Sequence, residues 1–474
     1  MPTPIRFDNS YIRLPARFFA ALAPTPVAAP KGVRVNVALA RDLGIDPDWL
    51  AGDDGVAAIA GNALPLGAEP LAMAYSGHQF GHWSGQLGDG RAILLGETVV
   101  PDGRRYDIHL KGSGRTPFSR GGDGRAALGP VLREFLIGEG MHALGIPTTR
   151  VLAAVTTGES VLRQEGPLPG AVLARVALGH VRVGTFEHFA ARDDDEAVRI
   201  LADYCLARFY PALAEGPERY ARLLETVIAR TAALIAKWQC VGFIHGVMNT
   251  DNMSISGETI DYGPCAFMDV YHPGTVFSSI DHGGRYAYAN QPRIAQWNLA
   301  RFATALLPLL GAEEPVAIAA AQTAIDAFPA QFDAAYLAGM RAKLGFAGAE
   351  DGDRALVADL LERMADRHLD FTNTFRDLAD GVDCEALGDW RDAWAARRAR
   401  GATSAEAMAA ANPVYIPRNH RVEAALAAAY EGNLAPFDQL LEVLRAPFER
   451  RPAFAAFAAP PAAHEVVEAT FCGT

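Results

Sequence analysis

The sequence changes once from strand-forming to helix-forming patterns, near residue 186, and this change constrains the fold more than any other feature. Between about residues 91 and 183, short β-prone runs are separated by turn residues, with one helical stretch at about 124–144. From about residue 186 onward the chain is mainly helical. A run of strands followed by a run of helices predicts an α+β fold rather than a doubly wound α/β sheet.

Turn signals divide the strand-forming region into separate strands. Residues 91–100 and 105–111 flank a Pro-Asp-Gly-Arg turn and predict a β-hairpin. Three more strands are predicted at 150–157, 160–164 and 171–177. Apolar residues at helical spacing predict helices at 222–238 and near 315–345, 353–375 and 421–447.

The length and composition are those of a folded globular protein. The 474 residues allow three domains of about 150 residues each, or one large two-lobed unit. Half of the residues are hydrophobic and 21% are charged, which excludes a largely disordered chain. Residues 1–70, rich in Pro, Ala and Gly, predict an irregular N-terminal extension with short helices.

Charge and cysteine usage restrict the location and the partners. A net charge of −12 argues against non-specific binding to nucleic acid or to a membrane surface. No apolar run reaches the roughly 20 residues that a transmembrane helix needs. The cysteines are odd in number, scattered and without CxxC pairs, which is typical of a reducing cytoplasm: Cys205, Cys240, Cys265, Cys384 and Cys472.

Two glycine-rich segments could bind an anion. Gly88, Gly90 and Arg91 lie directly before a predicted strand, where backbone amides and a guanidinium can approach phosphate oxygens. Such a turn, taken alone, is more often structural. A second basic, glycine-rich loop at 112–125 leads into the start of a predicted helix and is a second anion-binding candidate.

A scarce lysine ends the second strand of the predicted hairpin. Only four of the 43 basic residues are lysines, and one of them is Lys111. A lysine at this position can reach phosphate oxygens while Glu134, in the following predicted helix, holds it in place. For either residue taken alone, an exposed surface position is the better interpretation.

The segment His-Gly-Val-Met-Asn-Thr-Asp-Asn at 245–252 matches part of the protein-kinase catalytic loop, H-R-D-x-x-x-x-N. His245 and Asn252 match the His and the metal-binding Asn, but Val247 stands where the catalytic base should be. Another carboxylate, Asp251, lies beside Asn252. The segment therefore resembles a kinase loop without its usual base.

Nine residues after Asn252 comes Asp261, in an Asp-Tyr-Gly sequence that matches the kinase D-F-G motif. An Asn carbonyl and an Asp carboxylate are oxygen ligands suited to Mg²⁺ beside nucleotide phosphates. The ordered set of glycine loop, strand Lys, helix Glu, loop Asn and Asp-Tyr-Gly predicts a nucleotide-binding site.

Six segments closely resemble the selenoprotein O family: residues 76–81, 87–91, 109–114, 245–252, 261–264 and 412–420. The resemblance runs from near residue 5 to the C-terminus. It implies a protein-kinase-like fold. The change of sequence pattern predicts two lobes joined near residues 180–190: a β-rich N-lobe at 71–185, and a helical C-lobe at 186–474 with the catalytic and metal motifs and a C-terminal tail. The resemblance also implies that ATP binds in an orientation flipped relative to active kinases.

The resemblance assigns roles to individual residues. Nucleotide contacts are implied for Gly88, Gly90, Arg91, Lys111, Asp123, Gly124, Arg175, Arg182 and Asp261. Asp251 matches the proposed proton acceptor, and Asn252 and Asp261 match the metal ligands. Relatives that named the family carry selenocysteine near the C-terminus, where this chain has Cys472, so a redox role for this thiol is weakened.

The implied activity is protein adenylylation, the transfer of AMP from ATP to Ser, Thr or Tyr hydroxyl groups of target proteins. The expected metal is Mg²⁺, with Mn²⁺ as the alternative. Two other functions stay open at this point: transfer of the γ-phosphate by a kinase, and an inactive nucleotide-binding scaffold. Retention of both metal ligands argues against the scaffold.

Overall fold

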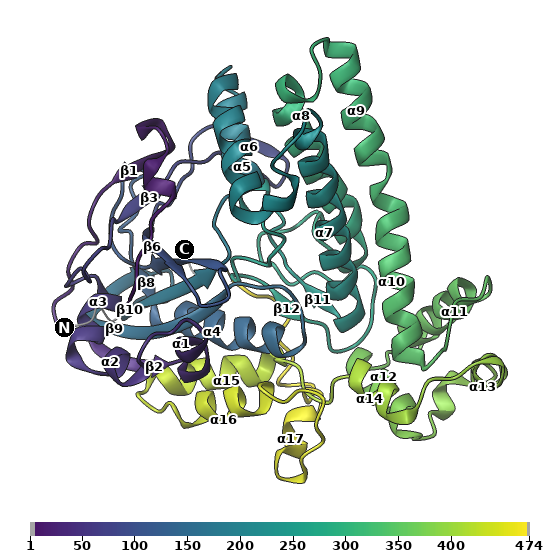
Figure 1. Cartoon of the computed structure of the whole chain (residues 1–474). Helices are drawn as coiled ribbons and strands as arrows, with labels where there is room; N and C mark the ends of the chain where they lie inside the picture. The colour runs from purple at the N-terminus through teal and green to yellow at the C-terminus, as the bar shows by residue number, and fades with distance from the viewer. Residues whose placement is uncertain (1–4, 472–474) are drawn as a thin grey trace.

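A computed structural model describes residues 5–471, and its centre is one antiparallel sheet flanked by helices (Figure 1). The strand order is β1-β3-β6-β7-β10-β9-β2, with β8 paired to β10. The predicted α+β class is therefore confirmed. The sheet strands are β1 Phe19–Ala21, β2 Lys31–Val35, β3 Leu71–Met73, β6 Ala92–Val99, β7 Arg105–Lys111, β8 Ala126–Ala127, β9 Arg150–Arg163 and β10 Gly166–Ala177.

The predicted hairpin is confirmed as β6 and β7, and the register of β7 with β10 positions three side chains of the predicted site region. Arg175 on β10 lies directly opposite His109 on β7, and Lys111 lies two residues further along β7. Cross-strand partners and alternate residues of one strand share a face of a sheet. Lys111, His109 and Arg175 therefore project from the same face.

The prediction of three strands between residues 150 and 177 is wrong, because the structure has two. β9 runs through residues 150–163 without a break, and β10 pairs with it along almost its whole length. Gly158 has φ +73°, and the register shifts between Pro169 and Ala171. A bulge at a residue that tolerates positive φ lets the ladder continue past what the sequence marks as a turn.

The helix predicted at 124–144 is confirmed as α4, Leu128–Ala143, although it begins four residues later. The first residues of the predicted range are not helical: Gly124 has φ +70°, and Ala126–Ala127 form the short strand β8. α4 packs against β9 and β10 on one side, and α15 and α16 contact it from another (Figure 1).

The chain after β10 is mainly helical, as predicted. Its helices are α5 Val183–Ala190, α6 Asp195–Phe209, α7 Arg219–Val241, α8 Gln291–Leu310, α9 Glu314–Asp326, α10 Phe328–Leu344, α11 Asp353–Asp366, α12 Phe371–Asp380, α13 Trp390–Arg400, α14 Ala405–Ala411, α15 Asn419–Tyr430, α16 Ala435–Leu444 and α17 Ala455–Ala458. Two small two-stranded sheets complete the site region: the hairpin of β4 Gly77–Gln79 with β5 His82–Ser84, and the pair of β11 Phe243–Ile244 with β12 Ala266–Phe267.

The N-terminal residues contribute to the sheet through β1 and β2, and three short helices follow: α1 Val37–Asp42, α2 Pro47–Ala51 and α3 Asp53–Ala60. The predicted boundaries at residues 70 and 185 stay predictions. Within residues 5–471, no helix is long and apolar enough to cross a membrane.

Candidate active site

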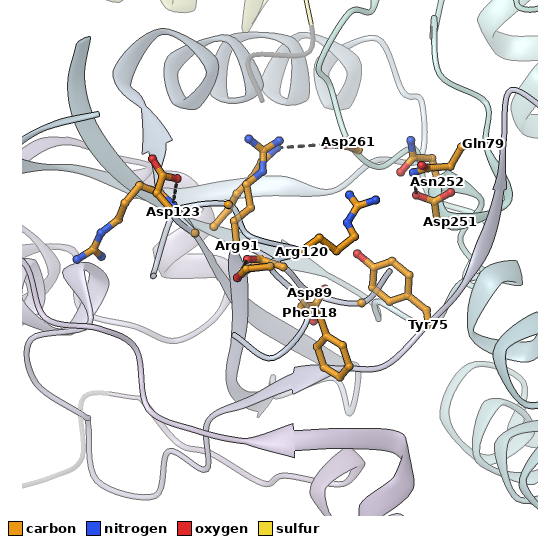
Figure 2. A pocket seen from close by; sticks show the side chains of 18 of the residues that line it. Tyr75, Gln79, Asp89, Arg91, Phe118, Arg120, Asp123, Asp251, Asn252 and Asp261 are labelled. Carbon is orange, nitrogen blue, oxygen red and sulfur yellow. Dashed lines mark hydrogen bonds and ion pairs between the residues drawn. The ribbon is translucent and has the colours of Figure 1, made fainter. Parts of the chain in front are cut away.

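A cavity of about 1020 Å³ opens between the sheet and the helical part of the chain. Its walls come from β6, β7 and β10, from the two glycine-rich segments and from the loop that follows β11. Figure 2 shows Asp251 and Asn252 together at one end, beside Gln79, with Asp123 at the opposite end. Every residue predicted to contact nucleotide or metal lines this one cavity: Gly88, Gly90, Arg91, Lys111, Asp123, Gly124, Arg175, Arg182, Asn252 and Asp261.

The two glycine-rich segments pack directly on each other. Gly88 has φ +87°, and a β-carbon there would lie 2.4 Å from the Phe118 ring. Gly124 has φ +70°, and a β-carbon would lie 2.2 Å from the Gly114 carbonyl. The Thr116 hydroxyl donates to the carbonyl oxygen of the residue after Gly88, at 2.7 Å. Close packing therefore requires glycine at both positions and leaves the loop backbones facing the cavity.

Glu134 holds two cations at the floor of the cavity. Its Oε2 accepts from Lys111 Nζ at 2.7 Å and its Oε1 from Arg175 Nε at 2.6 Å. Burial alone would raise the pKa of Glu134, but Arg175 and Lys111 lower it to about 2. The carboxylate is therefore ionised at neutral pH, and it fixes both cationic side chains before any ligand binds.

Asp261 completes this group from the other side of the cavity. Its Oδ1 lies 3.1 Å from Lys111 Nζ and 3.8 Å from Arg175 Nη2. Burial opposes ionisation, but Lys111 and Arg175 hold the pKa of Asp261 well below its usual range. The residue has φ +69°, which is uncommon for a residue other than glycine and is found most often at functional sites.

Asn252 lies on the short 3₁₀ turn Thr250–Asn252. Its Nδ2 donates to the Val247 carbonyl at 2.9 Å, so the side-chain oxygen is the atom that could bind a metal. His245 supports the same loop, because its Nε2 bonds to the Ile260 carbonyl at 2.9 Å, next to Asp261. Asn252 and Asp261 thus supply one amide oxygen and one carboxylate to the same cavity, a pair of ligands that suits Mg²⁺.

Asp251 is the one cavity carboxylate without a cation bonded to its oxygens in the described part of the chain. Its Oδ2 accepts from Gln79 Nε2 at 3.2 Å, and its buried Oδ1 has no hydrogen-bond partner among residues 5–471. Burial raises the pKa of Asp251 to about 6, against the opposing effects of Arg182 and Gln79. Such a carboxylate can accept a proton near neutral pH.

Arg182 connects this end of the cavity to the glycine loop. Its Nη1 donates to the Asp251 carbonyl at 2.7 Å, and its guanidinium lies 4.4 Å from the centre of the Tyr75 ring. Its Nη2 lies 3.8 Å from Asp89 Oδ1. Asp123, in contrast, lies at the far end and bonds Arg163 at 2.8 Å.

Three residues at the site were not found from the sequence: Tyr75, Gln79 and Asp89. Gln79 lies within one of the segments that carry the family resemblance, but no local pattern connects it with Asp251, which is 172 residues away. Cys472 lies outside the described residues. The four described cysteines are all free, and burial raises the pKa of Cys265, which lies close to Asp261 in sequence, to about 12.

A deep cavity with two glycine-rich loops, three inward cations and a separate carboxylate is typical of enzymes that bind a polyphosphate and transfer one of its groups. The sequence model described as "Protein adenylyltransferase SelO" matches residues 3–445. The chain belongs to this family.

Relatives named "Protein nucleotidyltransferase YdiU" are similar over nearly their whole length. The protein of Methylorubrum extorquens is 58% identical over 99% of each chain. That of Rhizobium etli is 58% identical over 99% of this chain and 97% of its own. That of Rhodopseudomonas palustris is 56% identical over 99% of each chain. The predicted family and the predicted enzyme class, a protein adenylyltransferase, are confirmed.

The raised pKa of Asp251 predicts an unusual effect on stability. Because its folded pKa exceeds the unfolded value, ionisation opposes folding, and stability falls as pH rises from about 4 to about 6. The neutral substitution Asp251→Asn should raise the free energy of unfolding at pH 7.5 by about 2 kcal/mol. Urea denaturation of both proteins at pH 4 and pH 7.5 measures this difference.

The difference should shrink toward zero at pH 4, where the parent carboxyl is itself protonated. Asp203→Asn serves as the control, because it changes a partly exposed aspartate on α6 that does not line the cavity. It should alter stability little at either pH. Lower stability of Asp251→Asn at pH 7.5 would contradict the assigned shift.

Proposed function

We propose that this protein transfers AMP from ATP to hydroxyl groups of target proteins, with Asp251 as the proton acceptor. The observation that carries the proposal is the position of Asp251. It is a buried carboxylate with a raised pKa, directly before Asn252, and it lines the same cavity as Val247, which occupies the usual kinase base position. The enzyme class follows from family membership, and the residue roles are our inference.

The order of elements around the cavity supports a protein-kinase-like fold. The strand that ends in Lys111 is followed by α4 with its Glu134, then by β9 and β10, and only later by the loop with Asn252 and by Asp261. Active kinases use the same sequence of strand Lys, helix Glu, loop Asn and metal-binding Asp. We infer two lobes, with the cavity between the sheet and the helical region.

Asn252 and Asp261 would hold a divalent cation, for which we propose Mg²⁺. Both residues supply oxygen atoms to the same cavity, and Asn252 is oriented by its bond to Val247. Mg²⁺ takes few protein ligands when phosphates supply the others, so two side chains are sufficient. When bound, the ion would neutralise charge on the phosphates.

The cationic side chains would bind the polyphosphate. Lys111 and Arg175 are fixed by Glu134, and Arg182 lies nearer to Asp251. We propose that these residues bind the outer phosphates and so present the α-phosphorus to the end of the cavity with Asp251. A guanidinium offers two parallel donors to phosphate oxygens, and fixed donors need little rearrangement as charge develops.

In the proposed reaction, the target hydroxyl oxygen bonds to the α-phosphorus, and the bond from that phosphorus to the oxygen bridging the β-phosphate breaks. The hydroxyl proton moves to Asp251, and diphosphate leaves with both electrons of the broken bond. The products are AMP-protein and diphosphate. Asp123 and Gly124, which line the same cavity from the second glycine-rich loop, are proposed as further nucleotide contacts.

Isotope position distinguishes this reaction from kinase activity. In a soluble bacterial protein extract with Mg²⁺, label should enter protein from ATP labelled at the α-phosphate and not from the γ-phosphate. Asp251→Asn should reduce that labelling by about 10²- to 10⁴-fold, as loss of a base does, while ATP binding changes little. Label from the γ-phosphate alone would show a kinase, and label from neither would show an inactive scaffold.

The pH dependence tests Asp251 separately. Because a proton acceptor must be ionised, the labelling rate should fall as pH drops through the pKa of Asp251, about 6. Gln79→Leu removes a hydrogen bond that lowers this pKa, so the acidic limb should move to higher pH. An unchanged limb in Gln79→Leu would assign the titration to another group. Rates at saturating ATP between pH 5 and pH 8 decide this.

A further inference from the structure

A buried charged pair in the cavity wall, Asp89 and His109, has no role in the proposed transfer of AMP. Asp89 lies between Gly88 and Gly90, and its side chain points toward the sheet. Its Oδ2 accepts from the Met73 amide at 3.0 Å and bonds His109 Nε2 at 3.1 Å. Both Asp89 and His109 are almost completely buried, which is costly unless such groups are paired and hydrogen-bonded.

Asp89 is ionised in spite of its burial. Desolvation would raise its pKa, but His109, Arg182 and the Met73 amide lower it to about 2. A full negative charge therefore lies within the turn whose backbone faces the cavity. Such a charge fixes any cation next to it.

That cation is Arg182, which is held from three sides. Asp89 lies 3.8 Å from one terminal nitrogen, the Asp251 carbonyl accepts from the other at 2.7 Å, and the Tyr75 ring stacks on the guanidinium. Arg182 Nε is buried and has no hydrogen-bond partner among residues 5–471. Arg182 lines the cavity, so its guanidinium can meet a phosphate oxygen there.

We propose that Asp89 and His109 are positioning residues, which hold Arg182 ready to bind the polyphosphate of ATP. The inference rests on the proposed function, because it assigns Arg182 to the phosphates. An arginine already fixed in its binding geometry loses less rotamer entropy when the ligand arrives. His109 acts one step further away, by orienting the Asp89 carboxylate between the Met73 amide and Arg182.

The same sheet face carries a matched comparison. His180 stacks on His109 with ring centres 4.2 Å apart, and its Nδ1 bonds Asp107 at 2.9 Å. Asp107 is thus a second buried aspartate paired with a histidine, but its cationic partner is Arg208, with Nη2 at 2.6 Å, rather than Arg182. Asp107→Asn is therefore the control for loss of a buried Asp–His pair in general.

The test is a double-mutant cycle on the full-length protein. Initial labelling rates in a fixed amount of the same protein extract give the KM for ATP and the maximal rate. Asp89→Asn keeps the volume and the acceptor for Met73, and should raise the KM for ATP about 10-fold while the maximal rate changes less than about 3-fold. In an Arg182→Ala background the same change should alter KM less than about 2-fold, because the residue on which it acts is gone.

His109→Gln should act in the same direction with a smaller effect, and it supplies the same cycle if Asp89→Asn does not fold. Asp107→Asn should show no coupling to Arg182→Ala. Equal effects of Asp89→Asn in both backgrounds, or a loss of maximal rate with KM unchanged, would overturn the positioning role alone. An Arg182→Ala protein with unchanged KM for ATP would overturn the proposed role of Arg182 and this inference together.

Discussion

The site depends on one buried carboxylate, Glu134, which bonds two cations at once. Lys111 comes from β7 and Arg175 from β10, and without an anion between them the two charges would repel each other at the floor of the cavity. Glu134 is positioned by α4, which packs on the sheet and is itself covered by α15 and α16. The charged floor therefore depends on helices that lie nearly three hundred residues further along the chain.

The loop that carries Asp251 is fixed by a second set of contacts. Glu187 on α5 accepts from the Thr250 hydroxyl and bonds His78 at 2.6 Å, which ties the loop to the β4–β5 hairpin. A β-carbon on Gly77 would lie 2.7 Å from Asp251 Oδ1. The hairpin therefore excludes space around the carboxylate, and this burial is the main reason that Asp251 titrates near neutral pH.

Local patterns in the sequence predict what local forces determine. The β6–β7 hairpin and α4 follow from turn residues and apolar spacing, and the order of Lys111, Glu134, Asn252 and Asp261 along the chain indicates a nucleotide site. The continuous β9 was missed because long-range pairing with β10 overrode the turn signal at Gly158. Arg175 and Arg182 were assigned to the site only through the family resemblance. The roles proposed for Asp89 and His109 were not predicted from the sequence at all, because contacts between distant segments leave no local pattern.

The central claim is that the α-phosphorus of ATP, and not the γ-phosphorus, lies beside Asp251. The most direct measurement is a crystal structure of the complex with Mg²⁺ and the slowly reacting analogue α,β-methylene-ATP. The account predicts that the α-phosphorus is the phosphorus nearest to the Asp251 carboxylate, with the outer phosphates on Arg175 and Arg182. A γ-phosphorus nearest to Asp251, with the α-phosphorus on the arginines, would contradict it.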